Sequence, residues 1–375
     1  MASAKYKLNS RGYYEAKVWD GTYTQTGAKH RKTIISKKSS ADLEKKVIAF
    51  KNQLEKQEVA EINITFGEYS RRWLDIYKQT KELNTQRMYR VCVNNYLAPL
   101  EDIRLVDLKH SHFQQIINQN SEHPKTCKNI KLTFTQIIKS AVRERYLPHT
   151  AIESITMDIS MPKYQKPQKR PLLDIEKQAM MDADLDDKKR VFVTVLYYCG
   201  LRRGEALALT TDDFDWKNKT VSISKVIIFD GNNPILKPYP KSDNGIRIVP
   251  LPEPCISILK PYVNNSKGYL FKCEDNDYMT ESAYKRMWQS IVTSMNIALG
   301  YNPQAKNRDA RPIQNLTAHI FRHNYCSMLC YQIPAISTKK IAQLMGDTEK
   351  VVLDVYSHIM EEQEDVKGAL EKAFG

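Results

Sequence analysis

The segment His319-Ile-Phe-Arg322-His323 is the most informative part of this sequence. The apolar residues around it recur at helical spacing, which predicts a helix over residues 318–331. Residues three positions apart lie on one face of a helix, so His319 and Arg322 should project together. An imidazole beside a guanidinium can move a proton next to a bound anion.

Three other segments of the C-terminal half also carry cationic or proton-transferring side chains. Each is weak evidence alone, but together they form a specific pattern. The other three are Cys199-Gly-Leu-Arg202-Arg203-Gly-Glu205, Pro240-Lys241-Ser242 with Arg247-Ile-Val-Pro250, and Leu344-Met-Gly346-Asp347 with Tyr356-Ser-His358.

Together the four segments resemble the catalytic domain of the tyrosine recombinases, in particular the integrases of prophages and conjugative transposons of Gram-positive bacteria. The resemblance implies a site-specific recombinase that cleaves and rejoins DNA through a covalent 3′-phosphotyrosyl intermediate, integrating or excising a mobile element. It implies no cofactor, metal or ATP. The phosphotyrosyl ester keeps much of the bond energy, and arginines supply the positive charge.

The resemblance also implies a role for each catalytic residue. Arg202 and Arg322 would hold the scissile phosphate, since a guanidinium is always protonated and can grip two oxygens. Tyr356 would be the nucleophile, although its ordinary pKa near 10 means that it needs help to lose its proton. Lys241 would protonate the departing 5′-oxygen, and His319 would assist proton transfer.

Two of these assignments have rivals. Arg203 competes with Arg202, which is preferred because the family's arginine directly follows Gly-Leu. Glu205, one helical turn after Arg202, could also brace its guanidinium. Lys237 is the alternative to Lys241.

Asp347 departs from the family pattern, which has His or Trp directly after the glycine at 346. An ionised carboxylate there would repel a phosphate. Three explanations are open: Asp347 is protonated, it pairs with Arg322 or another cation, or it points away from the site. We expect Asp347→His to retain or raise strand cleavage.

Other functions compete with recombination. His319, His323, Cys326 and Cys330 have spacings that suggest zinc, but they span about 16 Å of one helix, too far to converge on one ion. We therefore expect no metal site. A DNA-binding regulator of the same fold that no longer cuts DNA remains an alternative, and so does a type IB topoisomerase.

The periodicities predict a mainly α fold with small β-sheets, arranged in three domains. Residues 1–60 should form a three-stranded sheet followed by a helix, with a hairpin turn at Asp20-Gly21. Residues 61–165 should form a bundle of four or five helices. Residues 166–375 should form a mixed, mostly helical catalytic domain, preceded by a basic, proline-containing linker at 161–170.

The charge predicts a polyanionic partner. The chain carries 57 Lys and Arg against 43 Asp and Glu, a net charge of +14, and this excess favours nucleic acid. The excess is greatest in the N-terminal 60 residues, which resemble an arm-type DNA-binding domain. Its candidate DNA contacts are Tyr14, Lys17, Trp19, Arg31 and Lys32.

The partners implied by the resemblance are double-stranded DNA at core and arm attachment sites and three further copies of the chain in a homotetramer on DNA. An excisionase or a DNA-bending protein is a further candidate. The terminal segment Glu361–Gly375 would dock onto a neighbouring protomer, or pack in cis as an ordinary helix. The sequence carries neither an apolar span nor a secretory signal, so we expect a cytoplasmic, nucleoid-associated protein with reduced cysteines and no membrane contact.

Overall fold

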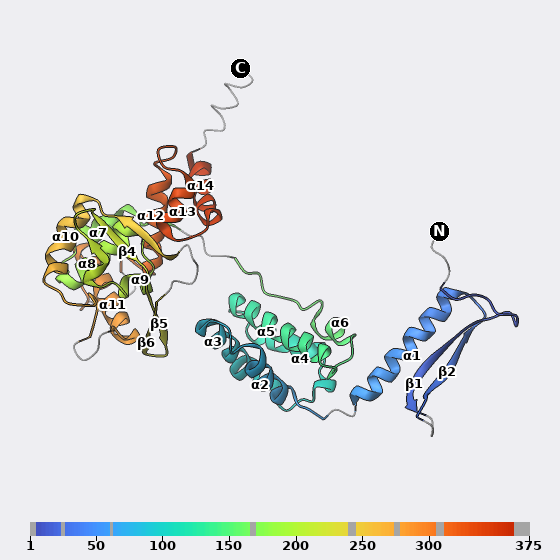
Figure 1. The fold of residues 1–375 in the computed structure, drawn as a ribbon. Coiled ribbons are helices and arrows are strands. Elements are labelled where there is room, and N and C mark those ends of the chain that lie inside the picture. Colours follow the sequence, from blue (N-terminus) through green and yellow to red (C-terminus); the bar gives the residue numbers. More distant parts are fainter. Residues whose placement is uncertain are drawn as a thin grey trace, which may run out of the picture. The chain divides into compact units, whose positions relative to one another are not determined.

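The computed structural model describes residues 5–23, 27–60, 63–165, 170–238, 245–273, 278–304 and 311–363. The chain divides into two compact units, residues 1–166 and 167–375 (Figure 1). The fold is mainly α-helical with small antiparallel sheets, as predicted. In the described residues, no helix is long and apolar enough to cross a membrane.

The first unit begins with an antiparallel pair of strands packed against a helix: β1 (Tyr14–Tyr23), β2 (Lys29–Ser36) and α1 (Ser40–Ala60). The predicted third strand is wrong for the described residues, where the segment before β1 forms only an isolated bridge, Leu8 to Tyr14. The Asn9 carboxamide accepts hydrogen bonds from the backbone N–H groups of Arg11 and Tyr13. Residues 9–13 therefore form a tight turn and cannot form a third strand beside β1.

The hairpin turn predicted at Asp20-Gly21 is also wrong, because β1 runs through both residues to Tyr23. The register with β2 shifts between Trp19 and Tyr23, which is a β-bulge. The Asp20 carboxylate contacts the His30 ring across the two strands. An irregular strand thus accommodates a dipeptide that ordinarily marks a turn.

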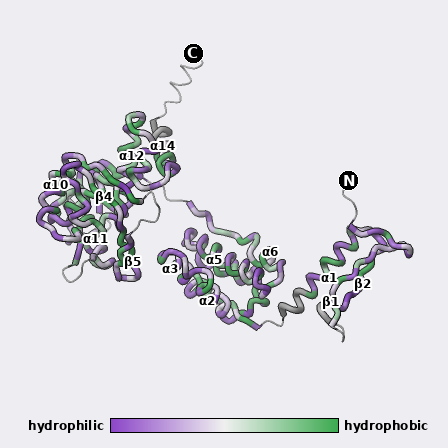
Figure 2. The backbone as a smooth tube through the Cα atoms, viewed as in Figure 1, coloured by the Kyte–Doolittle hydropathy of each residue, from purple (hydrophilic) through white to green (hydrophobic). Residues whose placement is uncertain are grey.

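Five α-helices follow, as the periodicity predicted, joined by short π and 3₁₀ turns. They bury a core in which Phe113 stacks on Phe134 with ring centroids 4.0 Å apart. Apolar residues alternate with polar ones along each helix, as expected for helices with one buried face (Figure 2). The helices are α2 (Phe66–Tyr77), α3 (Leu83–Val91), α4 (His110–Gln119), α5 (Pro124–Arg143) and α6 (Ala151–Thr156).

The second unit holds the remaining helices, and the helix predicted over residues 318–331 is present as α12. A buried cluster centred on α8, α10 and α11 forms its main core, where Phe192 meets Phe271 edge-on. A smaller cluster lies among α12, α13 and α14. The helices are α7 (Asp174–Asp182), α8 (Asp187–Cys199), α9 (Arg203–Leu207), α10 (Glu253–Asn264), α11 (Glu281–Ala298), α12 (Ala318–Cys330), α13 (Thr338–Met345) and α14 (Glu349–Gln363).

The β-branched residues of 219–229 predict one strand, but the segment forms two strands that belong to different sheets. The first joins the sheet β3-β4-β7 and the second pairs with β6. The chain leaves the first sheet at Lys225, whose ammonium binds the Asp213 carboxylate at 2.9 Å. The strands are β3 (Phe214–Asp215), β4 (Thr220–Ile223), β5 (Val226–Asp230), β6 (Asn233–Lys237) and β7 (Arg247–Pro250).

Candidate active site

Arg202 stands at a sharp turn between α8 and α9. Helix α8 ends at Gly200, which has the left-handed φ of +61°. A Cβ atom on Gly200 would lie 2.3 Å from Cδ1 of Tyr325, so the close approach of α12 also requires glycine. The next residue, Leu201, is fully buried and anchors the turn. Arg202 is therefore presented from a constrained backbone.

Glu205 braces Arg202, as the sequence predicted. Nη1 of Arg202 donates to Oε1 of Glu205 at 2.8 Å, and the Arg202 backbone N–H donates to Oε2 at 3.0 Å. The Glu205 side chain is only 1% exposed, whereas that of Arg202 is 38% exposed. The carboxylate thus holds the guanidinium from the protein side and leaves part of it open to solvent.

Arg322 reaches the same place from α12 and is almost completely buried. Its Nη1 donates to the Gly200 carbonyl at 2.9 Å, and its Nη2 donates to the Met345 carbonyl at 2.5 Å. Burial, together with the positive charge of Arg202, lowers the pKa of Arg322 to about 10. Arg322 therefore remains a cation at neutral pH.

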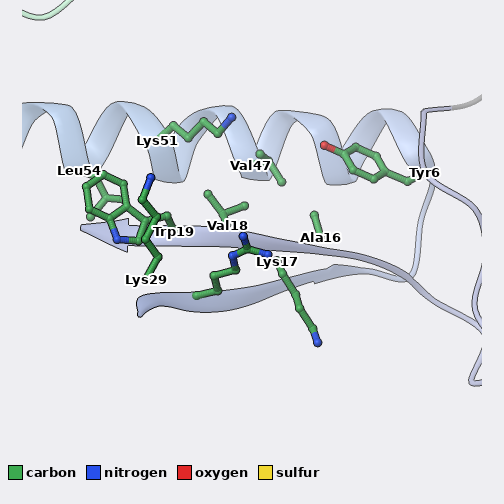
Figure 3. A pocket seen from close by; sticks show the side chains of 10 residues that line it. Tyr6, Ala16, Lys17, Val18, Trp19, Lys29, Val47, Lys51 and Leu54 are labelled. Atoms are coloured by element: carbon green, nitrogen blue, oxygen red, sulfur yellow. The ribbon is translucent and has the colours of Figure 1, made fainter. Parts of the chain in front are cut away.

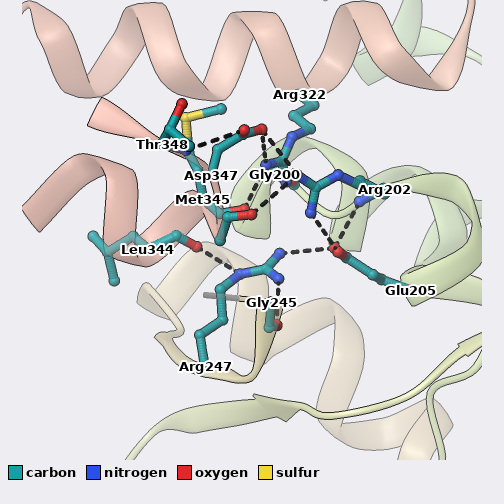
Figure 4. A network of polar contacts seen from close by, with 11 residues as sticks. Gly200, Arg202, Glu205, Gly245, Arg247, Arg322, Leu344, Met345, Asp347 and Thr348 are labelled. Carbon is teal, nitrogen blue, oxygen red and sulfur yellow. Dashed lines mark hydrogen bonds and ion pairs between the residues drawn. The ribbon is translucent and has the colours of Figure 1, made fainter. Parts of the chain in front are cut away.

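Asp347 lies between the two arginines (Figure 4). Its Oδ2 accepts from Nη2 of Arg202 at 2.8 Å and from Nη2 of Arg322 at 3.0 Å. Burial alone would raise the pKa of Asp347. The hydrogen bond from Arg322 and the charges of both arginines outweigh burial and hold the pKa below its ordinary value. Of the three explanations that the sequence left open for Asp347, the structure supports the second, in which the carboxylate pairs with cations.

Arg247 is a component of this cluster to which sequence analysis gave no role. It lies on β7 with 4% of its side chain exposed and donates to Oε2 of Glu205 at 2.8 Å, to the Leu344 carbonyl at 2.8 Å and to the Gly245 carbonyl at 3.1 Å. It therefore ties β7 to the brace of Arg202 and to the end of α13. The sequence did contain one sign of this role. Side chains of a strand alternate between its two faces, and Arg247 is on the same, buried face as Val249.

We expect Glu205→Gln to lower the free energy of unfolding by about 3–5 kcal/mol, because it leaves the buried Arg247 without its counter-charge. Urea denaturation measures the change. Glu253→Gln is the matched control, since its partner Lys219 is exposed and such surface pairs contribute at most about 1 kcal/mol. Equal losses in the two variants would contradict a structural role for the buried pair.

The same pair predicts a pH dependence. Burial raises the pKa of Glu205, but the hydrogen bond and charge of Arg247 and the charges of Arg322 and Arg202 outweigh it, so the pKa lies below the ordinary 4.5. A carboxyl group whose pKa is lower in the folded protein than in the unfolded chain stabilises the fold at any pH above the unfolded-state pKa. This stabilisation is lost as the pH falls through the folded-state pKa. The wild type should lose more stability than Glu205→Gln when the pH falls below about 4.5. Parallel acid curves for the two proteins would contradict this.

The rival arginine lies elsewhere. The Arg203 guanidinium sits over the rings of Phe229 and Tyr284, 5.1 and 5.0 Å from their centroids. Lys237 ends β6, whereas Lys241 lies outside the described residues, so the choice between the two lysines stays a prediction.

His319 and Tyr356 belong to elements that contact the cluster. His319 is exposed in the first turn of α12, one turn before Arg322, and its ring meets that of His323 at 4.5 Å. Tyr356 lies on α14 and packs, half-buried, on a cluster that includes Cys326 and Met345. Cys326 is one turn beyond Arg322, and the Met345 carbonyl accepts a hydrogen bond from Arg322. The nucleophile proposed by resemblance thus lies on helices adjoining the arginine pair.

Within the described ranges, no group of three or more His, Cys, Asp and Glu side chains is arranged to hold a metal ion.

Comparison with known proteins identifies the family. A model of the phage integrase family matches residues 171–363, more than half of the chain and all of the cluster described above. The chain belongs to the phage integrase family. The resemblance inferred from the four sequence segments is therefore confirmed, and tyrosine recombinase is the enzyme class of this family member.

Relatives and solved structures agree with the assignment. A tyrosine recombinase XerC-like protein of Caldanaerobacter subterraneus subsp. tengcongensis is 23% identical, covering 96% of this chain and 95% of that protein. The transposase of Tn916 from Enterococcus faecalis is 26% identical over 178 residues, 44% of this chain and 41% of that protein.

Two solved structures show the same fold. The Tn1549 transposon integrase in complex with a circular intermediate DNA has a TM-score of 0.63 and 17% identity, covering 80% of this chain and 100% of that one. A lambda integrase dimer bound to a core site has a TM-score of 0.58 and 13% identity, covering 94% and 95% of the two chains.

The N-terminal part of this integrase-family chain has a groove of about 700 Å³ between the strands and α1 (Figure 3). Lys17, Trp19 and Arg31 line it, together with Lys29 and Lys51. The other two predicted DNA contacts do not line this groove. Tyr14 packs on the small core with Val18 and Leu43, and the Lys32 ammonium lies over the Phe50 ring at 5.0 Å.

Proposed function

We propose that this chain cleaves and rejoins DNA at specific sites through a covalent bond between Tyr356 and a 3′-phosphate. The proposal rests on one observation: Arg202, from the turn before α9, and Arg322, from α12, direct their Nη2 atoms at a single anionic oxygen. A pair of guanidinium groups around one anion position is what a phosphodiester needs as its charge increases during displacement.

Each residue has a defined part in the reaction. The phenolic oxygen of Tyr356 attacks the phosphorus, a new O–P bond forms, and the bond to the 5′-oxygen breaks. Arg202 and Arg322 stabilise the charge on the non-bridging oxygens. Lys241 supplies the proton that the 5′-oxygen takes up, and His319 assists removal of the tyrosine proton. Attack by a 5′-hydroxyl of a second duplex then reverses the same bond changes and releases Tyr356.

Arg247 and Glu205 act behind the phosphate-binding arginines. Glu205 fixes Arg202 by two hydrogen bonds, and Arg247 holds the other carboxylate oxygen while binding the end of α13. These contacts spare the site much of the reorganisation that would otherwise accompany the reaction. They make Glu205 and Arg247 positioning residues.

DNA recognition is assigned to three domains, 1–60, 61–165 and 166–375. The separate hydrophobic clusters of the N-terminal sheet, the helical bundle and the second unit support this division. The first domain takes arm sites, and the other two take the core site. Four copies act together on two duplexes, as in the lambda integrase tetramer bound to a Holliday junction, with an excisionase or DNA-bending protein as helper.

The basic N-terminal groove predicts how DNA binding depends on salt, and this prediction can be tested without strand cleavage. Binding to arm DNA should weaken with salt with a log–log slope of about −0.9 for each phosphate neutralised. Arg31→Ala should make the slope shallower by about 0.9 if its guanidinium contacts one phosphate, as measured by fluorescence anisotropy at several salt concentrations. An unchanged slope would remove Arg31 from the DNA-contacting surface.

Trapping on a suicide substrate tests the proposed function. A duplex carrying a candidate element end is nicked close to the cut, so that the short 5′-hydroxyl fragment diffuses away and resealing fails. We expect a covalent protein–DNA adduct on a denaturing gel in the presence of EDTA and without ATP. DNA binding without any adduct would favour the regulator of the same fold. Relaxation of supercoils without strand exchange between duplexes would favour the topoisomerase.

A further inference from the structure

We propose that the Asp347 carboxylate occupies the position of the scissile phosphate in the DNA-free protein and must be displaced when DNA binds. This inference rests on the proposed function, because it takes Arg202 and Arg322 as the phosphate-binding pair. It assigns Asp347 the role of an internal anion that competes with the substrate.

The geometry of the carboxylate resembles that of a bound phosphate. One oxygen, Oδ2, bridges Arg202 and Arg322 at 2.8 and 3.0 Å, and the other, Oδ1, accepts from the Thr348 backbone N–H at 3.2 Å. Guanidinium groups bind carboxylates and phosphates with the same planar fork of donors. The donors that Asp347 uses are therefore the ones that a phosphodiester would use.

The backbone at the end of α13 places this carboxylate beside the arginines. Helix α13 ends at Gly346, whose φ of +60° is left-handed, and the Asp347 backbone N–H then bonds the Ala342 carbonyl at 3.0 Å. This helix cap fixes the position of the Asp347 backbone, and a side chain of only two rotatable bonds reaches both arginines.

The position can exchange its anion. The Asp347 side chain is 25% exposed and that of Arg202 is 38% exposed, so a phosphate can approach from solvent. Arg322, by contrast, is 2% exposed and also donates to two backbone carbonyls, those of Gly200 and Met345, which belong to neither anion. Displacing Asp347 therefore leaves the guanidinium of Arg322 in place.

The charges of the cluster show what displacement changes. Three arginines face two carboxylates, which leaves one net positive charge while Asp347 is ionised. The five residues are Arg202, Arg247, Arg322, Glu205 and Asp347. Asp347→Asn keeps the size of the side chain and leaves two net positive charges for the phosphate.

The test is carried out in Tyr356→Phe protein, so that only non-covalent binding is measured. Two core-site duplexes are compared, one with a natural scissile phosphate and one with an uncharged methylphosphonate there. We expect Asp347→Asn to increase the preference for the phosphate duplex by about tenfold, the scale of one charge-assisted contact. Asp354→Asn, an exposed site on α14, makes the same change in net charge and should leave the preference unaltered.

The outcomes separate the inference from the function on which it rests. An unchanged or smaller preference after Asp347→Asn overturns the inference. This holds even if the Tyr356→Phe protein with Asp347 intact prefers the phosphate duplex and the wild type forms adduct. If the Tyr356→Phe protein with Asp347 intact binds both duplexes equally and the wild type forms no adduct, the proposed function fails, and the inference fails with it.

Two further measurements distinguish competition from a merely structural role. Without DNA, Asp347→Asn should unfold at lower urea than the wild type, and inorganic phosphate should raise its midpoint more than that of the wild type. Asp347→His should retain or raise cleavage of the suicide substrate. A strong loss of cleavage in Asp347→His would show that the carboxylate helps the reaction and would overturn the inference.

Discussion

Tyr356→Phe is expected to form no covalent adduct with a suicide substrate that traps the wild type. The change removes one oxygen, the atom that would bond to phosphorus, and keeps the ring that packs on the cluster among α12, α13 and α14. Folding and non-covalent DNA binding should therefore be close to those of the wild type, as circular dichroism and a mobility shift on intact duplex would show.

Tyr331→Phe is the matched control, because Tyr331 is an exposed tyrosine directly after α12. It should form adduct at the wild-type rate. Adduct formation by Tyr356→Phe, at any appreciable rate, would mean that another side chain is the nucleophile.

Arg322→Ala and Arg202→Ala should each slow single-turnover cleavage by about 10²–10³-fold, the usual cost of removing one preorganised donor from a developing negative charge. The two variants differ in their expected side effects. Arg322 is buried and makes three polar contacts, so its loss should also reduce stability. Arg202 is partly exposed, so its variant separates a loss of catalysis from a loss of folding.

Arg203→Ala tests the specificity of this effect, since the two arginines are adjacent in sequence and Arg203 instead packs over Phe229 and Tyr284. We expect its cleavage rate to stay within a few-fold of the wild type. A loss as large as that of Arg202→Ala would reverse the assignment of the phosphate-binding residue.

Local sequence signals were sufficient for the helices and for the brace of Arg202. Helical spacing predicted α12, and the three-residue separation of Arg202 and Glu205 predicted their ion pair. Both depend on interactions within one or two helical turns, which a sequence displays directly. The strands were predicted less well, because only Ser224 and Lys225 separate β4 from β5, and the two differ in their pairing partners, β7 for β4 and β6 for β5.

The state of Asp347 and the role of Arg247 could not be derived from the sequence. Asp347 meets Arg202 across 145 positions, and Arg247 meets the Leu344 carbonyl across 97. Such contacts depend on how α9, α12, α13 and β7 pack together, which local patterns do not specify. Asp347 is recognisable in the sequence as an exception to the family pattern, but the cations that pair with it are seen only in the structure.

The most direct measurement is the identification of the residue that carries DNA in the trapped adduct. The adduct is digested with nuclease and protease, and the peptide that retains a nucleotide is sequenced by mass spectrometry. We expect a 3′-phosphate ester on Tyr356 and on no other residue. A nucleotide on a different tyrosine, or on a serine, would contradict it.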